Sequence, residues 1–318
     1  MYRDDNAEFD RLLDSSSDKV LFQLHGDDVG HCGDTLAHLA SRIGRSQFAS
    51  ALISKFLRNH DVEDLAKLVN RKGETVLHTA TFAGKYFVVE RIMKSIREAK
   101  PECDLTVFID ARDLQIEKRT ALHLAALDDG KFGDKTLMTR PVNNGCLSGC
   151  VNPNGPSGKS QAASFLIGNG ADLELEDIHG LTPFHLAVIH GQINVAKMLR
   201  RKLPNCINKP TNDGWMLSPL HLAVKQAAEA AVRIAPSTTS SSTAAMIRGM
   251  KQPAPTYSPN DFRYQRAFDM IEWLIHEGAD LNATDAAGRL PQHVFVIADE
   301  ANEKRNLVLA LSRFGLHY

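Results

Sequence analysis

The residues of this chain that are best suited to chemistry are six histidines, which recur in one short phrase. Imidazoles are common zinc ligands, so a metal site is the first hypothesis to weigh. The histidines are His38, His78, His123, His185, His221 and His293, at intervals of 40, 45, 62, 36 and 72 residues. If units of this kind stack in line, neighbouring imidazoles lie roughly 10 Å apart. No two could then share a metal whose ligands lie at roughly 2 Å, so the spacing favours a structural role.

Residues 154–160 end like a phosphate-binding loop, with Gly158, Lys159 and Ser160 in the expected order. The full pattern requires glycine five residues before Gly158, but that position holds Pro153, and no strand pattern precedes the loop. We therefore predict that Lys159 binds no nucleotide. We expect a helix over Ser160–Ile167 instead, with Ser157 or Ser160 at its start.

The remaining candidates for chemistry are weaker. Cys146 and Cys150 stand four residues apart, without the second pair that a zinc site needs. A stress-induced disulfide and a coincidence of two thiols are the alternatives. Scattered Asp, His and Ser residues form no triad or paired-acid motif. The sequence predicts no catalytic residue, no metal and no cofactor, and we expect a protein that is not an enzyme.

Composition narrows the class of protein. The 318 residues are 43% apolar and 24% charged with a formal net charge of −1, which is typical of a globular chain and offers no basic bias for direct nucleic-acid binding. Apolar runs are too short for a membrane helix, and the N-terminus lacks a secretory signal. Five scattered cysteines favour a reducing compartment. We expect a cytoplasmic protein that is monomeric when alone, with no membrane partner.

The histidine phrase carries signals for the start of a helix. Thr or Ser stands at the capping position, proline follows it in three copies, and glycine two residues earlier suits a tight turn. The copies are Thr35–Ala40, Thr75–Ala80, Thr120–Ala125, Thr182–Ala187, Ser218–Ala223 and the degenerate Leu290–Phe295. Gly-Ala-Asp-Leu at 170–173 and at 278–281 marks a helix end. The repeating unit is therefore helix–turn–helix–extended turn.

These phrases resemble the ankyrin repeat, whose pattern is a Thr-Pro-Leu-His-Leu-Ala start and a Gly-Ala-Asp turn about every 33 residues. The resemblance covers most of residues 33–318. It implies an all-α solenoid of stacked antiparallel helix pairs with β-hairpin-like fingers along one edge. It also implies that the phrase histidines make backbone hydrogen bonds between neighbouring turns.

The irregular intervals predict where the array is interrupted. We expect an acidic N-terminal capping segment over 1–31 and an ankyrin-repeat domain over 32–318. The repeats should span about 33–71, 72–116, 117–178, 179–213, 214–287 and 288–318, a division that follows the family length. Glycine-rich residues at about 129–158 and serine-rich residues at about 229–262 should be loop insertions that leave the stack intact. An alanine-rich stretch before the second insertion should lengthen the preceding helix.

A repeat protein without catalytic residues points to recognition of a protein partner on its concave surface and fingers. Trp215 is the leading candidate, because aromatic anchors dominate interface energetics. Packing of Trp215 against a neighbouring repeat is the alternative. The candidate partner-binding residues are Arg71, Lys72, Arg112, Gln115, Lys118, Glu176, Ile178, His179, Lys209, Asn212 and Trp215.

Three functions follow from this pattern. The first is a protein-interaction scaffold, such as a viral or bacterial effector in the cytoplasm or nucleus of a host cell. The second is an inhibitor of a Rel/NF-κB-type transcription factor, because the opening repeats are similar to IκB-type inhibitors. Residues 14–18 lie where such inhibitors carry a phosphodegron but lack its Gly and second spaced Ser. The third is the targeting subunit of a multi-chain enzyme.

Overall fold

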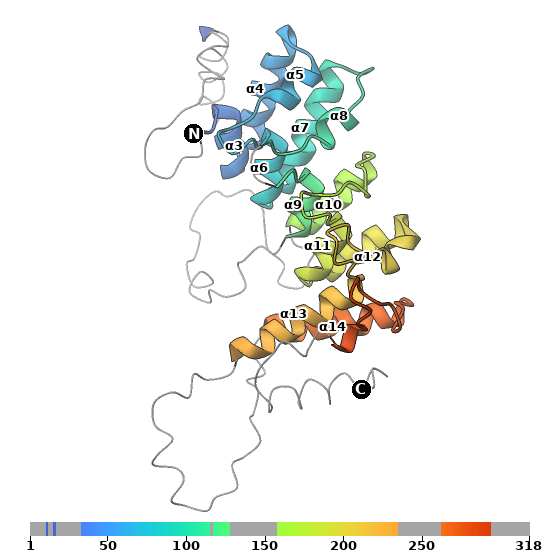
Figure 1. The fold of residues 1–318 in the computed structure, drawn as a ribbon. Coiled ribbons are helices and arrows are strands. Elements are labelled where there is room, and N and C mark those ends of the chain that lie inside the picture. The colour runs from blue at the N-terminus through green and yellow to red at the C-terminus, as the bar shows by residue number, and fades with distance from the viewer. Residues whose placement is uncertain are drawn as a thin grey trace, which may run out of the picture. The chain divides into compact units, whose positions relative to one another are not determined.

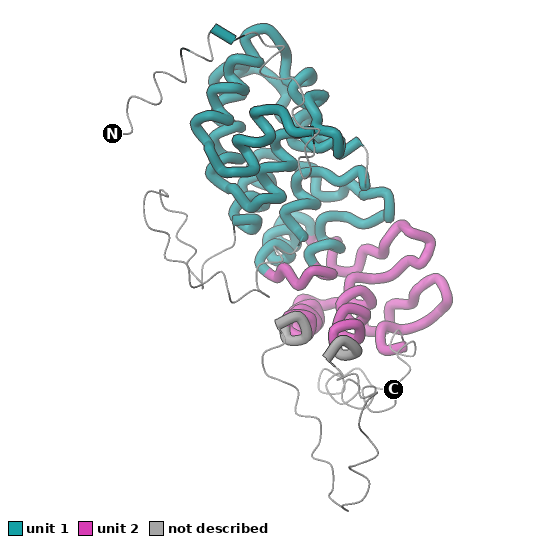
Figure 2. The backbone as a smooth tube through the Cα atoms, turned by 90° about the vertical axis from the view of Figure 1, so that its left-hand side faces the viewer, with its two compact units in different colours: residues 1–187, 194–203 teal, residues 188–193, 204–318 magenta. Residues whose placement is uncertain are grey.

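The computed structural model describes residues 11, 15–16, 33–114, 117–127, 158–234 and 262–293. The chain divides into two compact units, one of residues 1–187 with 194–203 and one of residues 188–193 with 204–318 (Figure 2). In the described parts all regular elements are helices, and the one bridge between extended residues joins Val69 to Thr75. The expected all-α class is confirmed.

Unit 1 is built from consecutive helix pairs, which Figure 1 shows along the chain. The pairs and their short companions are α3 (Leu36–Ile43) with α4 (Ser46–Asn59) and α5 (Val62–Lys67), α6 (Val76–Phe82) with α7 (Tyr86–Ala99) and α8 (Thr106–Ile109), α9 (Ala121–Ala126) with α10 (Gly158–Gly168), and α11 (Pro183–Ile189) with α12 (Ile193–Lys202). Residues 188–193, which join α11 to α12, are assigned to unit 2. The first helices pack in series, α3 on α6 and α6 on α9, and the second helices do the same, α4 on α7 and α7 on α10. The result is two adjoining layers of helices.

Unit 2 has the same organisation. It contains the 3₁₀ helix η3 (Pro204–Asn208) and the pair α13 (Pro219–Ile234) and α14 (Phe262–His276), which pack against each other. Its core includes Leu220, Met270 and Leu274, each at most 1% exposed. Helix α13 has 16 residues against seven in α11, so the alanine-rich stretch lengthens this helix as expected.

The phrase residues start the helices through their side chains. The Oγ1 atoms of Thr75 and Thr120 accept the backbone N–H of the histidine three residues later, which caps α6 and α9. Thr35 occupies the same position before α3 but makes no such cap bond, although its Oγ1 contacts Nδ1 of His38 at 2.8 Å as Thr75 and Thr120 contact their own histidines. The capping prediction is therefore right for the later helices and wrong in its detail for Thr35.

Both large insertions interrupt a helix pair without separating it. Helix α9 packs on α10 across residues 128–157, and α13 packs on α14 across residues 235–261. Our loop predictions for the insertions fall mainly on residues outside the described ranges. Helix α10 begins at Gly158, two residues earlier than predicted. A Cβ at Gly158 would lie 2.1 Å from the carbonyl oxygen of Gly84, so only glycine permits this close approach.

The ends of the chain are mostly outside the described residues. In the expected N-terminal capping segment, the backbone oxygen of Ser16 accepts a hydrogen bond from Nζ of Lys55 on α4 at 2.7 Å. In the expected last repeat, the backbone N–H of Leu290 donates to Nδ1 of His293 at 3.2 Å. No described helix has the length and apolar content that crossing a membrane requires.

Candidate partner-binding surface

Five loops lead from one helix pair to the next in the described parts, and we call them fingers. Finger 1 is residues 69–75, finger 2 is 111–120, finger 3 is 172–181, finger 4 is 210–217 and finger 5 is 280–289. Fingers 1–3 belong to unit 1 and fingers 4 and 5 to unit 2. Fingers 1–4 carry candidate residues, so the bonds that hold these loops determine which side chains are exposed.

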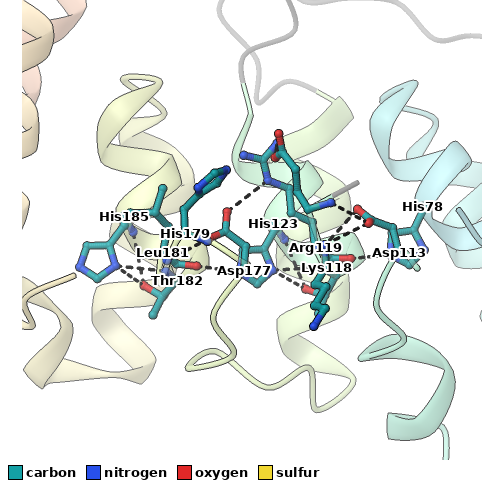
Figure 3. A network of polar contacts seen from close by, with 12 residues as sticks. His78, Asp113, Lys118, Arg119, His123, Asp177, His179, Leu181, Thr182 and His185 are labelled. Carbon is teal, nitrogen blue, oxygen red and sulfur yellow. Dashed lines mark hydrogen bonds and ion pairs between the residues drawn. The ribbon is translucent and has the colours of Figure 1, made fainter. Parts of the chain in front are cut away.

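The phrase histidines tie each helix start to the following finger. Nε2–H of His78 donates to the carbonyl oxygen of Arg119 at 2.9 Å, and Nε2–H of His123 donates to that of Leu181 at 3.1 Å (Figure 3). His38 makes the equivalent bond to Glu74 and His221 to Arg289. A carbonyl can only accept, so the proton lies on Nε2 and Nδ1 is left as an acceptor.

Burial keeps these imidazoles neutral. Desolvation lowers the pKa of His38 and of His123 to about 4 from an ordinary value of 6.5, and it also lowers the pKa of His78 and His221. In each ring Nε2 bonds the next finger, while Nδ1 of His78 accepts the backbone N–H of Thr75. Within the described ranges no three His, Cys, Asp or Glu residues form a group that could hold a metal ion.

Buried carboxylates hold the finger loops from inside. In finger 2, Asp113 accepts the backbone N–H groups of Glu117, Lys118 and Arg119 at 3.0–3.3 Å. In finger 3, Asp177 accepts those of His179 and Leu181, as Figure 3 shows. Asp285 does the same in finger 5. The carboxylates of Asp113 and Asp177 therefore stabilise the backbone of their own fingers.

Backbone bonds also join successive fingertips within each unit. The N–H of Leu114 donates to the carbonyl of Gly73 at 3.2 Å, and the N–H of Ile178 donates to that of Glu117 at 3.0 Å. In unit 2 the N–H of Ala286 donates to the carbonyl of Trp215 at 2.9 Å. Fingers 1–3 form one continuous ladder, and fingers 4 and 5 form another.

Most of the predicted partner-binding residues are exposed on these tips. The exposed ones are Arg71, Lys72, Arg112, Lys118, Ile178, His179, Asn212 and Trp215. Glu176 and Lys209 are partly buried, and Gln115 lies outside the described residues. The Trp215 side chain is 58% exposed, which favours an exposed indole over packing against a neighbouring repeat.

Sequence reasoning missed two exposed apolar side chains at the fingertips. Leu114 is 69% exposed in finger 2, and Met216 is 52% exposed beside Trp215 in finger 4. Met216 has a φ of 53°, in the left-handed region, at the position two residues before the helix cap. Glycine fills that position in fingers 1, 3 and 5, whereas Lys118 fills it in finger 2 with a φ of 52°. The absence of glycine at this position in fingers 2 and 4 can be seen in the sequence. It could have identified these two fingers as unusual.

Comparison with known families bears on the repeat architecture. A family model described as ankyrin repeats (3 copies) matches residues 150–235. The chain contains ankyrin repeats. One solved structure that the chain resembles is the complex of the predatory endopeptidase Bd0816 of Bdellovibrio bacteriovorus with the immunity protein Bd3460. The match covers 88% of this chain and 98% of the matched chain of that complex. The TM-score is 0.50 and the identity 17%, so this likeness concerns the fold alone.

Two further proteins are similar to this chain. The human ASB11 ankyrin repeat domain is 16% identical, with a TM-score of 0.49 over 89% of this chain and 84% of the other. A transient receptor potential cation channel, subfamily A member 1, of Drosophila melanogaster is 27% identical over an alignment of 188 residues. The alignment covers 54% of this chain. This chain spans 15% of the length of that channel protein. Ankyrin repeats as a class serve protein–protein interaction.

The apparent phosphate loop contributes a packed lysine to the ankyrin array. Lys159 is 2% exposed, and its Nζ lies 3.4 Å from the carbonyl oxygen of Leu127 and 5.0 Å from the centre of the Phe82 ring. The carbonyl and the ring face both attract the ammonium. The lysine therefore stabilises the contact of α10 with α6 and α9, and the prediction that it binds no nucleotide still awaits a test.

Proposed function

We propose that this protein is a non-catalytic scaffold that binds a protein partner through its fingers and the concave face of the repeats. The observation that carries the proposal is Trp215, which presents its indole with 58% exposure on finger 4. Large aromatic side chains are enriched among the residues that dominate interface energies. A tryptophan left in water on a binding module is best explained by a partner that covers it.

Finger 4 holds Trp215 in a fixed loop. The backbone N–H of Trp215 donates to Oδ1 of Asp213 at 2.9 Å, and Oγ1 of Thr211 donates to the same oxygen at 2.7 Å. The Thr211 hydroxyl in turn accepts the N–H of Leu217 at 2.9 Å. Because the loop is already ordered, binding loses little backbone entropy, and preorganisation of this kind raises affinity.

The fold supports the non-catalytic part of the proposal, since ankyrin repeats typically act as binding scaffolds without chemistry of their own. The imidazoles of His38, His78, His123 and His221 are engaged in backbone bonds, and the carboxylates of Asp113, Asp177 and Asp285 hold finger loops. The partner's surface should offer an apolar recess for the indole and the neighbouring Met216.

Capture of partners by the full chain, with quantitative mass spectrometry, tests the proposal. The bait proteins are the native chain, Trp215→Ala and the control Phe87→Ala, whose ring is 57% exposed on α7 away from any finger. A captured protein is then purified and its Kd is measured. We expect Trp215→Ala to raise this Kd about 30-fold, the equivalent of about 2 kcal/mol, and Phe87→Ala to leave it unchanged. Equal effects of the two substitutions, or no effect of either, would overturn the role of finger 4.

Narrower roles rest on sequence patterns. The similarity of the opening repeats to IκB-type inhibitors makes a Rel homology region the specific candidate partner, and a purified Rel homology region tests it directly. Saturable binding that is weakened by substitutions in finger 1 would support the inhibitor. Absence of binding at micromolar concentration would leave the general scaffold, of which an effector in the cytoplasm or nucleus of a host cell is one form.

A further inference from the structure

We propose that the tips of fingers 1–3 form a docking strip for an acidic, partly apolar segment of a protein partner. This inference rests on the proposed scaffold function and specifies the partner's chemistry at a second place, on unit 1. The strip consists of Arg71 and Lys72 on finger 1, Arg112, Leu114 and Lys118 on finger 2, and Ile178 on finger 3.

At the tips of these fingers the acidic and the basic side chains differ in their exposure to solvent. Residues 70–74, 111–119 and 176–180 contain five basic and five acidic side chains, so their formal charge balances. Among these tip residues the exposed charged side chains are all basic, namely Arg71, Lys72, Arg112 and Lys118, whereas the part of finger 3 that precedes its tip exposes Asp172 and Glu174. Gln115 and Ile116, outside the described residues, add no charge by sequence. A partner meets the basic layer first.

The acidic side chains of these tips are buried or partly buried. Asp113 and Asp177 are buried and accept backbone N–H groups. Glu117 pairs with Arg119, which also reaches Asp177 at 3.4 Å. Glu74 accepts from Nδ2 of Asn70 at 2.9 Å, and Glu176 is partly buried. The tip carboxylates are therefore less exposed than the four basic side chains.

The backbone of Lys118, within the strip, has a conformation that is unfavourable for a residue with a side chain. It adopts a φ of 52° at the position where fingers 1, 3 and 5 have glycine. A residue with a Cβ is strained there, whereas glycine is not. Strain of this kind that persists on an exposed loop points to a function of the side chain.

Apolar side chains lie between the cations. Leu114 is 69% and Ile178 is 51% exposed. The ladder bonds from Leu114 to Gly73 and from Ile178 to Glu117 place fingers 1, 2 and 3 next to one another. A segment that alternates carboxylates with aliphatic residues would satisfy both the charges and the apolar surface. Exposed apolar contacts favour such a protein segment over a nucleic acid, which would use the cations alone.

A synthetic peptide of about ten residues tests the strip. In extended form it covers about 33 Å, enough for three fingers spaced by roughly 10 Å. The probe is a fluorescently labelled peptide of alternating glutamate and leucine, and the control peptide has glutamine for glutamate. Polarisation is measured with the full chain. We expect the acidic peptide to bind at least about tenfold more tightly than the control, and its Kd to rise with salt.

Protein variants locate the binding. Lys118→Gly should raise the Kd for the acidic peptide about fivefold, the scale of one exposed ion pair. Glycine is the residue of the equivalent fingers, so this variant should fold, and its thermal melt verifies that. Combining it with Arg71→Gln, Lys72→Gln and Arg112→Gln should raise the Kd at least about 50-fold. Lys197→Gln removes an exposed lysine from α12 and should have no effect.

Several results would overturn the strip. Equal binding of both peptides, or a combined variant that binds the acidic peptide normally, removes the electrostatic argument. Tighter binding of a labelled RNA of about ten nucleotides, with the same loss in the combined variant, would reassign the strip to nucleic acid. These failures leave the scaffold proposal standing if Trp215→Ala still weakens a captured partner. Loss of that Trp215 effect tests finger 4 and does not bear on the peptide.

Discussion

The carboxylate of Asp113 accepts the backbone N–H of Lys118 at 3.0 Å and holds that residue at a φ of 52°. The same carboxylate also accepts the N–H groups of Glu117 and Arg119, so three bonds to one buried side chain fix the loop. The conformation is therefore imposed by the fold rather than preferred by lysine. Finger 4 holds Met216 in the same region without glycine.

Lys118→Gly tests the balance of strain and loop order. Glycine relieves the left-handed strain but gains freedom in the unfolded chain, and the two effects nearly cancel. We expect the free energy of unfolding to change by between about 0 and +1 kcal/mol, measured by urea denaturation. Lys118→Val, a β-branched residue with no access to this φ, should lower it by about 1–2 kcal/mol. A stabilising valine would show that the loop can relax.

The neutral histidines predict sensitivity to acid. The folded pKa of His38 and of His123 is about 4, below the ordinary 6.5, so as the pH falls through 6.5 the unfolded chain takes up protons that the folded chain excludes. Stability is full above pH 6.5 and is lost progressively toward pH 4. Between pH 6.5 and pH 5 the loss should be about 2 kcal/mol for each of these imidazoles.

Urea denaturation at a series of pH values measures this loss. His123→Gln keeps a side-chain donor for the Leu181 carbonyl, and it should lower stability at pH 7 but flatten the pH profile by about one proton. His179→Gln removes an exposed imidazole and is the matched control. An unchanged profile in His123→Gln would mean that other groups cause the acid effect.

Trp215 should behave as an exposed side chain in the free protein. In Trp273→Phe protein, which isolates its emission, we expect a red-shifted spectrum that added iodide quenches readily. Trp215→Ala should change the free energy of unfolding by less than about 0.5 kcal/mol, as for surface positions. Blue-shifted, protected emission together with a loss of about 3–5 kcal/mol would instead indicate a packed ring.

The insertions should be dispensable for the fold. The flanking helices α9 and α10, and α13 and α14, already contact each other, so removal of 131–157 or of 237–260 should leave the thermal melt cooperative and little shifted. Leu186→Ala and Leu222→Ala, at 2% and 5% exposure, should each cost about 2–5 kcal/mol. A deletion that destabilises as much as the leucine variants would show that the insertion packs on the repeats.

Lys159 should not bind a nucleotide. Its Nζ lies 3.4 Å from the Leu127 carbonyl and the side chain is 2% exposed, so a phosphate could reach it only after α10 had moved. Calorimetric titration with millimolar Mg-ATP should show no saturable heat. Saturable heat in the native chain that is absent from Lys159→Met would overturn this prediction and the non-catalytic assignment with it.

The sequence alone determined the repeat architecture, because that information is local and periodic. A capping Thr, a histidine three residues later and a glycine before the turn recur at each unit, so the pattern predicts helix starts such as those at Val76 and Ala121. The lengthened helix before the second insertion was likewise readable from its alanines. Solenoid contacts are made between neighbouring units, which is why a local pattern carries so much of the fold.

Only the tertiary structure decided which side chains of the fingers are exposed. The sequence shows five basic and five acidic residues at the finger tips 70–74, 111–119 and 176–180, and their exposure depends on bonds such as those that the Asp113 and Asp177 carboxylates accept from the backbone. The exposure of Trp215 and the burial of Lys159 were also undecided, since each depends on elements distant in the chain or on the path of a loop. Burial is a property of the packed array, and a residue's type and neighbours in sequence do not fix it.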